Sequence, residues 1–158
     1  MSQMKFLLVV LVFAGFSQMG QAQTIEKGVL SPGLFFTSAA GGLENSPSIG
    51  ISFSYYVANN LGIGLNAFNF VFGEDYSSST FGPYARYYFG SGSFYGQAGI
   101  TFSSVKVGDE SDSATGLNLG AGYSFFITDD IAIEPSLALN RANETTVISM
   151  AIGASFLF

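Results

Sequence analysis

The C-terminal segment of the chain, residues 148–158, alternates between large apolar side chains and small or polar ones. One face of an extended chain would carry Ile148, Met150, Ile152, Ala154, Phe156 and Phe158, and the other would carry Ser149, Ala151, Gly153 and Ser155, with Leu157 as the exception. Because successive side chains on a strand point to opposite faces, this period of two predicts a strand with one apolar face. The alternation recurs along the chain and indicates a closed barrel in a membrane.

Eight segments combine this alternation with many aromatic and β-branched residues, which are typical of strands. They cover residues 28–38, 46–58, 61–72, 79–90, 93–107, 115–128, 131–140 and 145–158. Each is close to or above the roughly 9–11 residues that a tilted strand needs to cross a bilayer. We therefore expect an all-β fold, an eight-stranded antiparallel transmembrane β-barrel with up-and-down meander connectivity.

The connections between these segments alternate in length. Three are tight turns, at Ala58–Asn60, Gly90–Gly92 and Thr128–Asp130. The others are mostly longer and contain many of the acidic residues; they cover 39–45, 73–78, 108–114 and 141–144. Short periplasmic turns and longer outer loops are the layout of an outer-membrane barrel. An even number of strands then places both termini on the periplasmic side.

The composition of the two faces indicates which of them meets lipid. In residues 46–58 and 115–128 the face opposite the large apolar side chains is made mostly of Gly, Ser and Asn, not of the Lys and Glu typical of a water-exposed surface. Only 10% of the chain is charged, whereas a soluble surface is about a quarter or more charged. An apolar outside around a small polar interior is the inverse of a soluble barrel, so we expect the chain among the lipids of the cell outer membrane.

Residues 61–72 depart from this pattern. Asn69 falls on the expected lipid face, whereas Phe68, Phe70 and Phe72 fall on the lumen face. A β-bulge near Ala67 would reverse the register of the strand. Alternatively, the three aromatic rings fill the outer half of the lumen.

The first residues of the chain are typical of an export signal. Lys5 is followed by an apolar run over 6–16 that is too short to span a bilayer, and small residues precede Gln23. We expect a signal peptide over residues 1–22, cleaved between Ala22 and Gln23, and one barrel domain over residues 23–158. A retained membrane anchor is the alternative interpretation.

Three segments carry a family resemblance: Tyr55–Leu65, Phe81–Phe89 and Gly120–Ile127. With them the chain resembles the small eight-stranded outer-membrane β-barrel proteins of Gram-negative bacteria, the family of the outer membrane protein beta-barrel domain. The resemblance covers the whole mature chain and implies the barrel fold. It also implies that Phe158, with Phe156 at the alternating position before it, is the terminal aromatic signal that the barrel-assembly machinery recognises.

Two charged residues fall on the lumen face within the expected strands, Arg86 and Glu134. A buried charge is costly unless it is paired, so each needs a partner. One hypothesis is that they pair across the lumen, closing it and gating it. The other is a purely structural ion pair surrounded by Tyr84, Tyr88 and water.

The composition disfavours several classes of function. With 5 Lys and Arg against 11 Asp and Glu the chain is too acidic for nucleic acid, which is bound through phosphate-neutralising bases. With no cysteine and no histidine it lacks thiolate and imidazole metal ligands and a Ser-His-Asp triad, so we expect no cofactor, no metal and no enzyme, a lipid-modifying enzyme being the unlikely exception.

Two functions remain. The first is a structural or surface-interaction role with a side-chain-filled lumen, in which the outer loops meet an unknown extracellular ligand. The second is a narrow channel or binding site for small molecules, including apolar ones that leave through the barrel wall.

Overall fold

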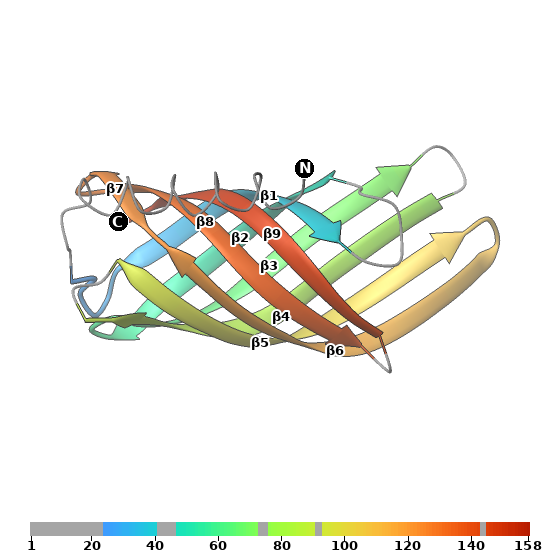
Figure 1. Cartoon of the computed structure of the whole chain (residues 1–158), viewed down its shortest axis with the longest axis horizontal. Coiled ribbons are helices and arrows are strands. Elements are labelled where there is room, and N and C mark those ends of the chain that lie inside the picture. The colour runs from blue at the N-terminus through green and yellow to red at the C-terminus, as the bar shows by residue number, and fades with distance from the viewer. Residues whose placement is uncertain (1–23, 41–46, 73–75, 91–92, 143–144) are drawn as a thin grey trace, which may run out of the picture.

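The computed structural model describes residues 24–40, 47–72, 76–90, 93–142 and 145–158, and they form a closed antiparallel barrel (Figure 1). The strands are β1 (Leu30–Ala40), β2 (Pro47–Ala58), β3 (Leu61–Phe72), β4 (Tyr76–Phe89), β5 (Phe94–Val107), β6 (Glu110–Tyr123), β7 (Phe125–Thr128), β8 (Ile131–Ala142) and β9 (Thr145–Phe156). The described residues include no helix long and apolar enough to cross a membrane.

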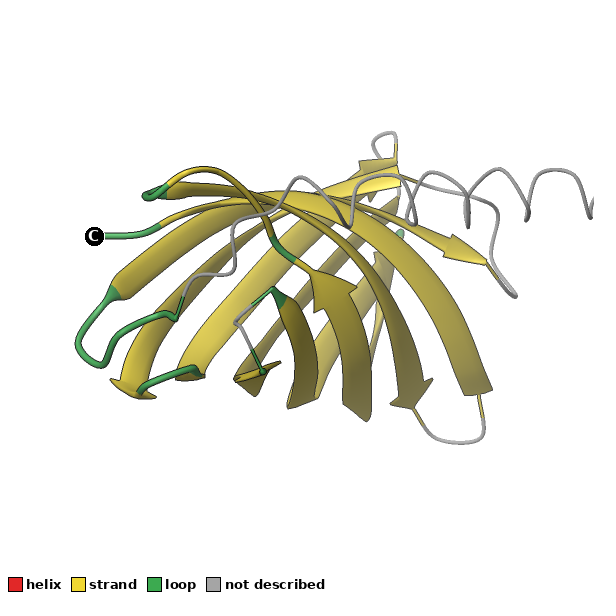
Figure 2. Ribbon diagram, turned by 60° about the vertical axis from the view of Figure 1, so that its left-hand side comes forward, coloured by secondary structure: helices red, strands yellow, loops and turns green. Residues whose placement is uncertain are grey.

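Apart from β6 and β7, consecutive strands pair with one another, and β1 pairs with β9 to close the barrel. β6 and β7 act as one strand along β8: Gly122 lies opposite Ser136 and Phe125 lies opposite Ile133, so the register continues across the interruption at Ser124. The barrel therefore has eight strands in meander order, which confirms the expected fold class. Figure 2 shows the strands tilted around a central lumen.

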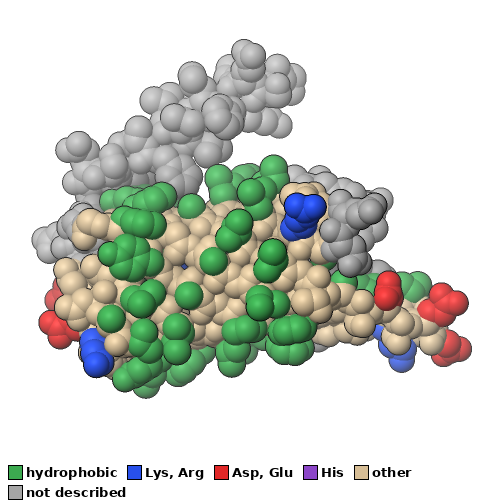
Figure 3. Space-filling model, turned by 90° about the horizontal axis from the view of Figure 1, so that it is seen from below, with side chains coloured by type: hydrophobic (Ala, Val, Ile, Leu, Met, Phe, Trp, Pro, Cys, Tyr) green, Lys and Arg blue, Asp and Glu red, His purple; other side chains and the backbone are tan. Residues whose placement is uncertain are grey.

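Alternation divides the side chains between the two faces as expected. Large apolar side chains of every long strand are exposed on the outer face, including Ile51, Leu119 and Leu139 at 59%, 59% and 47%. The space-filling view shows such side chains spread over the middle of the barrel, and the acidic groups visible on this face lie at its two ends (Figure 3). Since an exposed apolar belt of this extent is unfavourable in water, it is the surface that contacts lipid.

The register of β3 excludes the bulge that the sequence suggested near Ala67. β3 pairs with β4 without a shift from Leu61 opposite Tyr87 to Phe72 opposite Tyr76. The ring of Phe68 lines the lumen and packs edge-on against Phe35, with 6.1 Å between ring centroids. The aromatic filling of the outer lumen is therefore observed at Phe68, whereas the side chains of Asn69, Phe70 and Phe72 lie outside the described residues.

All four segments expected to be outer loops are partly strand. β1 runs to Ala40 and β8 to Ala142, β4 already begins at Tyr76, and β6 begins at Glu110, directly after the turn that follows Val107. The physical reason is that a hairpin extending beyond the membrane needs no lipid-facing apolar residues, so a polar segment such as 110–114 can still pair with β5 through its backbone. Hydrophobic alternation therefore marks only the part of a strand that crosses the membrane.

Replacing Leu119 by Arg tests the lipid-facing surface. We expect a loss of about 2–4 kcal/mol in the free energy of folding into bilayer vesicles, because a guanidinium would face the lipid core. Ser111→Arg is the matched control: Ser111 is exposed on the same face of the same strand, at its outer end, where the cost should be within about 1 kcal/mol. Urea titration of folding measures both, and equal costs would contradict the assignment of the membrane belt.

Candidate functional site

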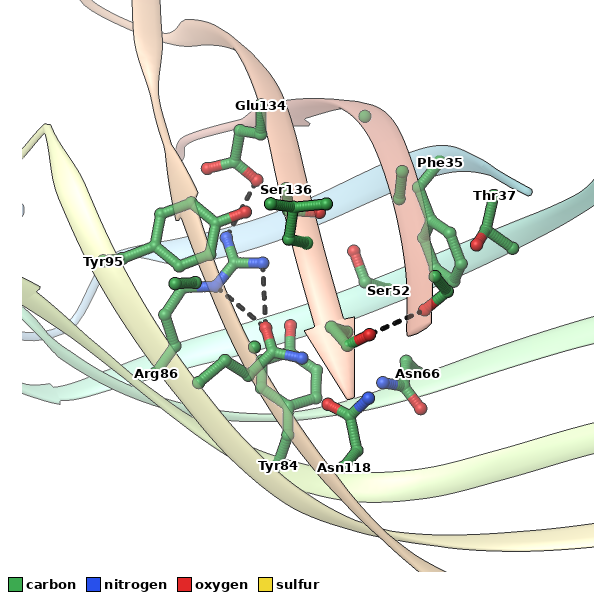
Figure 4. A pocket seen from close by; sticks show the side chains of 18 of the residues that line it. Phe35, Thr37, Ser52, Asn66, Tyr84, Arg86, Tyr95, Asn118, Glu134 and Ser136 are labelled. Carbon is green, nitrogen blue, oxygen red and sulfur yellow. Dashed lines mark hydrogen bonds and ion pairs between the residues drawn. The ribbon is translucent and has the colours of Figure 1, made fainter. Parts of the chain in front are cut away.

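An ion pair crosses the lumen between β4 and β8. The Nη1 atom of Arg86 lies 2.8 Å from Oε2 of Glu134, and the two side chains are only 11% and 6% exposed. These are the two lumen charges that the sequence singled out, and the structure brings them together (Figure 4). Their strands are not neighbours, so the pair links opposite walls of the barrel.

Both oxygens of the Glu134 carboxylate are fully engaged. Oε1 accepts hydrogen bonds from the hydroxyls of Tyr88 at 2.9 Å and Ser124 at 2.6 Å. Oε2 accepts one from Ser155 at 2.7 Å in addition to the ion pair. A carboxylate with this many donors can remain ionised although it is removed from water.

The guanidinium of Arg86 is held in an equally fixed position. Its Nε and Nη2 donate to Oε1 of Gln97 at 3.2 and 3.1 Å, and Nη1 also donates to the hydroxyl of Tyr88 at 3.3 Å. The cation lies over the ring of Tyr95, 4.1 Å from its centroid, and 5.7 Å from that of Tyr84. Hydrogen bonds and two aromatic faces together compensate for the loss of hydration.

An apolar layer closes the lumen on the periplasmic side of the ion pair. It consists of buried side chains that are at most 8% exposed: Ile25, Tyr56, Tyr88, Tyr95 and Leu157. Small residues opposite these rings leave the necessary space. At Gly122, for example, an added Cβ would collide with the hydroxyl end of Tyr95.

The outer half of the lumen contains two cavities that are lined by both polar and apolar side chains. One cavity of about 120 Å³ begins at the ion pair, and a second of about 250 Å³ lies closer to the outer end. They share lining residues, among them Phe68, Asn140 and Ser149. Asn118 donates to Asn140 at 2.6 Å and Asn140 donates to Ser149 at 2.9 Å, whereas the buried Oδ1 atoms of Asn118 and Asn66 have no partner within the described part of the chain.

The network around the pair contains residues that sequence reasoning missed. Nothing in the sequence distinguished Gln97, Ser124 and Ser155 as partners of the ion pair. The alternation of side chains along each strand does place all three on the lumen face, and this is the signal that could have identified them. Tyr88 contacts the pair directly, whereas the hydroxyl of Tyr84 hydrogen-bonds to Ser54. Among the described residues no group of three or more His, Cys, Asp or Glu could hold a metal.

The residues proposed for export and assembly lie at the ends of the chain. Ala22 and Gln23 fall outside the described residues. Phe156 ends β9, and Phe158 is 77% exposed, with its backbone N–H and C=O both hydrogen-bonded to Leu30 at 2.9 Å. The C-terminal aromatic ring is thus displayed at the periplasmic rim.

A closed eight-stranded barrel with an apolar belt and a polar interior is an integral outer-membrane protein. The chain belongs to the family of the outer membrane protein beta-barrel domain, whose family model matches residues 8–156. No curated protein matches the sequence.

Solved structures of outer-membrane barrels are similar to this one. The N-terminal barrel domain of OprF from Pseudomonas aeruginosa is 18% identical with a TM-score of 0.72, and the match covers 86% of this chain and 100% of that domain. Ail of Yersinia pestis, in complex with the heparin analogue sucrose octasulfate, is 20% identical with a TM-score of 0.60 (84% and 99% covered). OprG of Pseudomonas aeruginosa is 14% identical with a TM-score of 0.62 (88% and 99%). At these identities the likeness establishes the fold.

Replacing one partner of the ion pair should lower the free energy of unfolding by more than the intact pair contributes to it. We expect Arg86→Ala or Glu134→Ala to lower the free energy of unfolding by about 3–5 kcal/mol, because each leaves a buried unpaired charge. The double variant should lose much less than the sum of the two. Urea unfolding of all four proteins in vesicles measures the coupling, and additive losses would show that the two charges do not stabilise each other.

Proposed function

We propose that this outer-membrane barrel has a structural or surface-interaction role, with a lumen closed to solutes. The observation that carries the proposal is the closure of the periplasmic half of the lumen by two consecutive layers. The buried pair of Arg86 and Glu134 forms the first layer, and the apolar cluster around Tyr56 and Leu157 forms the second. Eight strands enclose an interior that side chains can fill, and here they fill one half of it.

The outer end of the barrel offers the surface for a partner. The strands around the β5–β6 hairpin extend beyond their neighbours: Tyr76 pairs with Val107, and Val107 pairs with Glu110 (Figure 1). β6 pairs with β8 only from Gly116 onward, so within the described chain residues 110–115 have a strand partner on one side alone. A free strand edge is a template for pairing with another chain.

The charges of this hairpin restrict the chemistry of such a partner. Asp109, Glu110 and Asp112 are exposed, and Lys106 is the base nearest to them in sequence. Ail has been solved with a polyanionic heparin analogue. The acidic hairpin of the present chain would repel a polyanion, so we propose a partner that is neutral or basic where it meets this edge.

The second candidate function is a binding site or narrow channel for small molecules, and the hollow outer half of the lumen favours it. The lining combines amide and hydroxyl groups with apolar side chains such as Phe35, Phe68 and Leu137, which suits solutes with both polar and apolar parts. A catalytic role is not part of the proposal, since the sequence contains no histidine to activate a serine in the lumen.

Conductance measurements separate the two candidates. We expect the refolded, heat-modifiable barrel to be silent in a planar lipid bilayer, because both closing layers lie across the path of ions. A conducting porin added afterwards to the same bilayer serves as the positive control. A steady single-channel current from the parent barrel would refute the closed lumen and favour the channel.

We also propose that residues 1–22 are removed during export and that the terminal aromatic directs barrel assembly. In the outer-membrane fraction of expressing cells, the intact mass should correspond to a chain that begins at Gln23. Deleting Phe158 should reduce the heat-modifiable form in that fraction, whereas Phe158→Tyr, which retains an aromatic ring, should preserve it. Full assembly of the deletion variant would contradict a signalling role for Phe158.

A further inference from the structure

A short segment before β1 is folded back into the barrel mouth. Gly28 has a φ of +96°, a backbone conformation that turns the chain and that glycine adopts without strain. It directs residues 24–27 toward the lumen, where Ile25 is only 3% exposed while Thr24, Glu26 and Lys27 are exposed. The segment Thr24–Lys27, here called the plug, thus inserts one apolar side chain into the lumen.

The plug is held by the β2–β3 turn and by no strand ladder. The N–H of Ile25 donates to Oδ1 of Asn60 at 3.0 Å, and the N–H of Asn60 donates to the carbonyl of Ile25 at 2.9 Å. The N–H of Lys27 donates to Oδ1 of Asn59 at 3.1 Å. Asn60 has a φ of 64°, which asparagine tolerates and which aims its amide at the plug.

The position of Ile25 makes the plug part of the closure. It belongs to the apolar cluster with Tyr56, Tyr88 and Leu157, on the periplasmic side of the ion pair. The other members of this cluster belong to strands, except Leu157, which directly follows β9. The N–H of Leu157 donates to the carbonyl of Asp130 at 2.8 Å. Ile25 is therefore the one member of the closing layer that could leave while the barrel ladder remains intact.

We propose that the plug is a displaceable periplasmic gate, in series with the ion pair of Arg86 and Glu134, and that releasing both makes the barrel a pore for small solutes. The hollow outer half of the lumen already reaches the ion pair. Amide and hydroxyl groups such as those of Asn118, Asn140 and Ser149 line it, together with apolar side chains and, near its outer end, Arg141, and these polar groups can solvate water and small polar solutes. An apolar constriction excludes water while it is closed, and Ile25 completes the constriction that it forms with Tyr56, Tyr88 and Leu157.

Two sets of substitutions test the gate. The first set, Asn60→Gly with Ile25→Ser, is designed to release the plug. Glycine keeps the turn conformation but lacks the amide oxygen that accepts from Ile25, and serine removes the apolar side chain from the cluster. Asn60→Asp with Ile25→Val is the matched control, since aspartate keeps the oxygen acceptor and valine keeps the apolar side chain. Arg86→Ala with Glu134→Ala removes the ion pair, and Arg86→Gln with Glu134→Gln replaces it if the alanine pair fails to form a heat-modifiable barrel.

Each set is measured alone and combined by single-channel recording in potassium chloride. We expect the combination of open plug and absent ion pair to conduct on the order of tenfold more than either set alone, whereas the control plug combined with the absent ion pair stays closed. If removal of the ion pair alone conducts as well as the combination, the plug is no barrier and the inference is wrong. A silent combination in a folded barrel overturns it as well.

The inference rests on the closed lumen of the proposed function, and the same recordings separate the two failures. A conducting parent barrel refutes the closed lumen itself. A silent parent, with combined variants that conduct no better than the ion-pair variant, refutes only the plug.

Discussion

The hydrocarbon core of a bilayer offers no partner to a backbone N–H or C=O group, and this constraint determines most of the structure. Strands can cross such a medium only if their edges are paired with one another, so the sheet must close. Closure occurs where β1 meets β9, with Gly33 opposite Ser155 and Ala40 opposite Ile148. Eight strands then set the width of the lumen, and the side chains inside it have to be small on average.

A narrow lumen makes each large or charged residue inside it consequential. Tyr56, Tyr88 and Tyr95 occupy the periplasmic half, and glycine faces them, as Gly122 does under Tyr95. Arg86 has no route to solvent through this layer, so its charge is balanced locally by Glu134 and by the hydroxyls around it. The ion pair is thus a consequence of the closed lumen and also helps to close it. Removing either partner would leave the other charge buried without a counter-charge.

The membrane-crossing part of the fold could be predicted from the sequence because lipid imposes a period of two with a strong contrast between the faces. The same phase selected Arg86 and Glu134 as lumen residues. It could not show that Ser124 and Ser155 bond to the carboxylate, since serine is also the ordinary small filler of the lumen. Nor could it mark the strand over 110–114, where water on both sides removes the contrast, or the burial of Ile25, which depends on a turn at Gly28 and on Asn60 far along the chain.

The two halves of the lumen differ in a way that relates closure to the orientation of the barrel. The periplasmic half contains the buried tyrosine rings, the ion pair and Leu157, whereas the outer half contains the cavities, which are lined by Asn66, Asn118 and Asn140 together with Phe35 and Phe68. A plug made from the N-terminal segment can form only at the end where the chain enters the first strand, which is the periplasmic end. Among the described residues, the outer end of the barrel is built from extended hairpins. The same connectivity therefore places the barrier toward the cell interior and leaves the polar cavity and the free strand edge facing outward, where a surface-directed protein would use them.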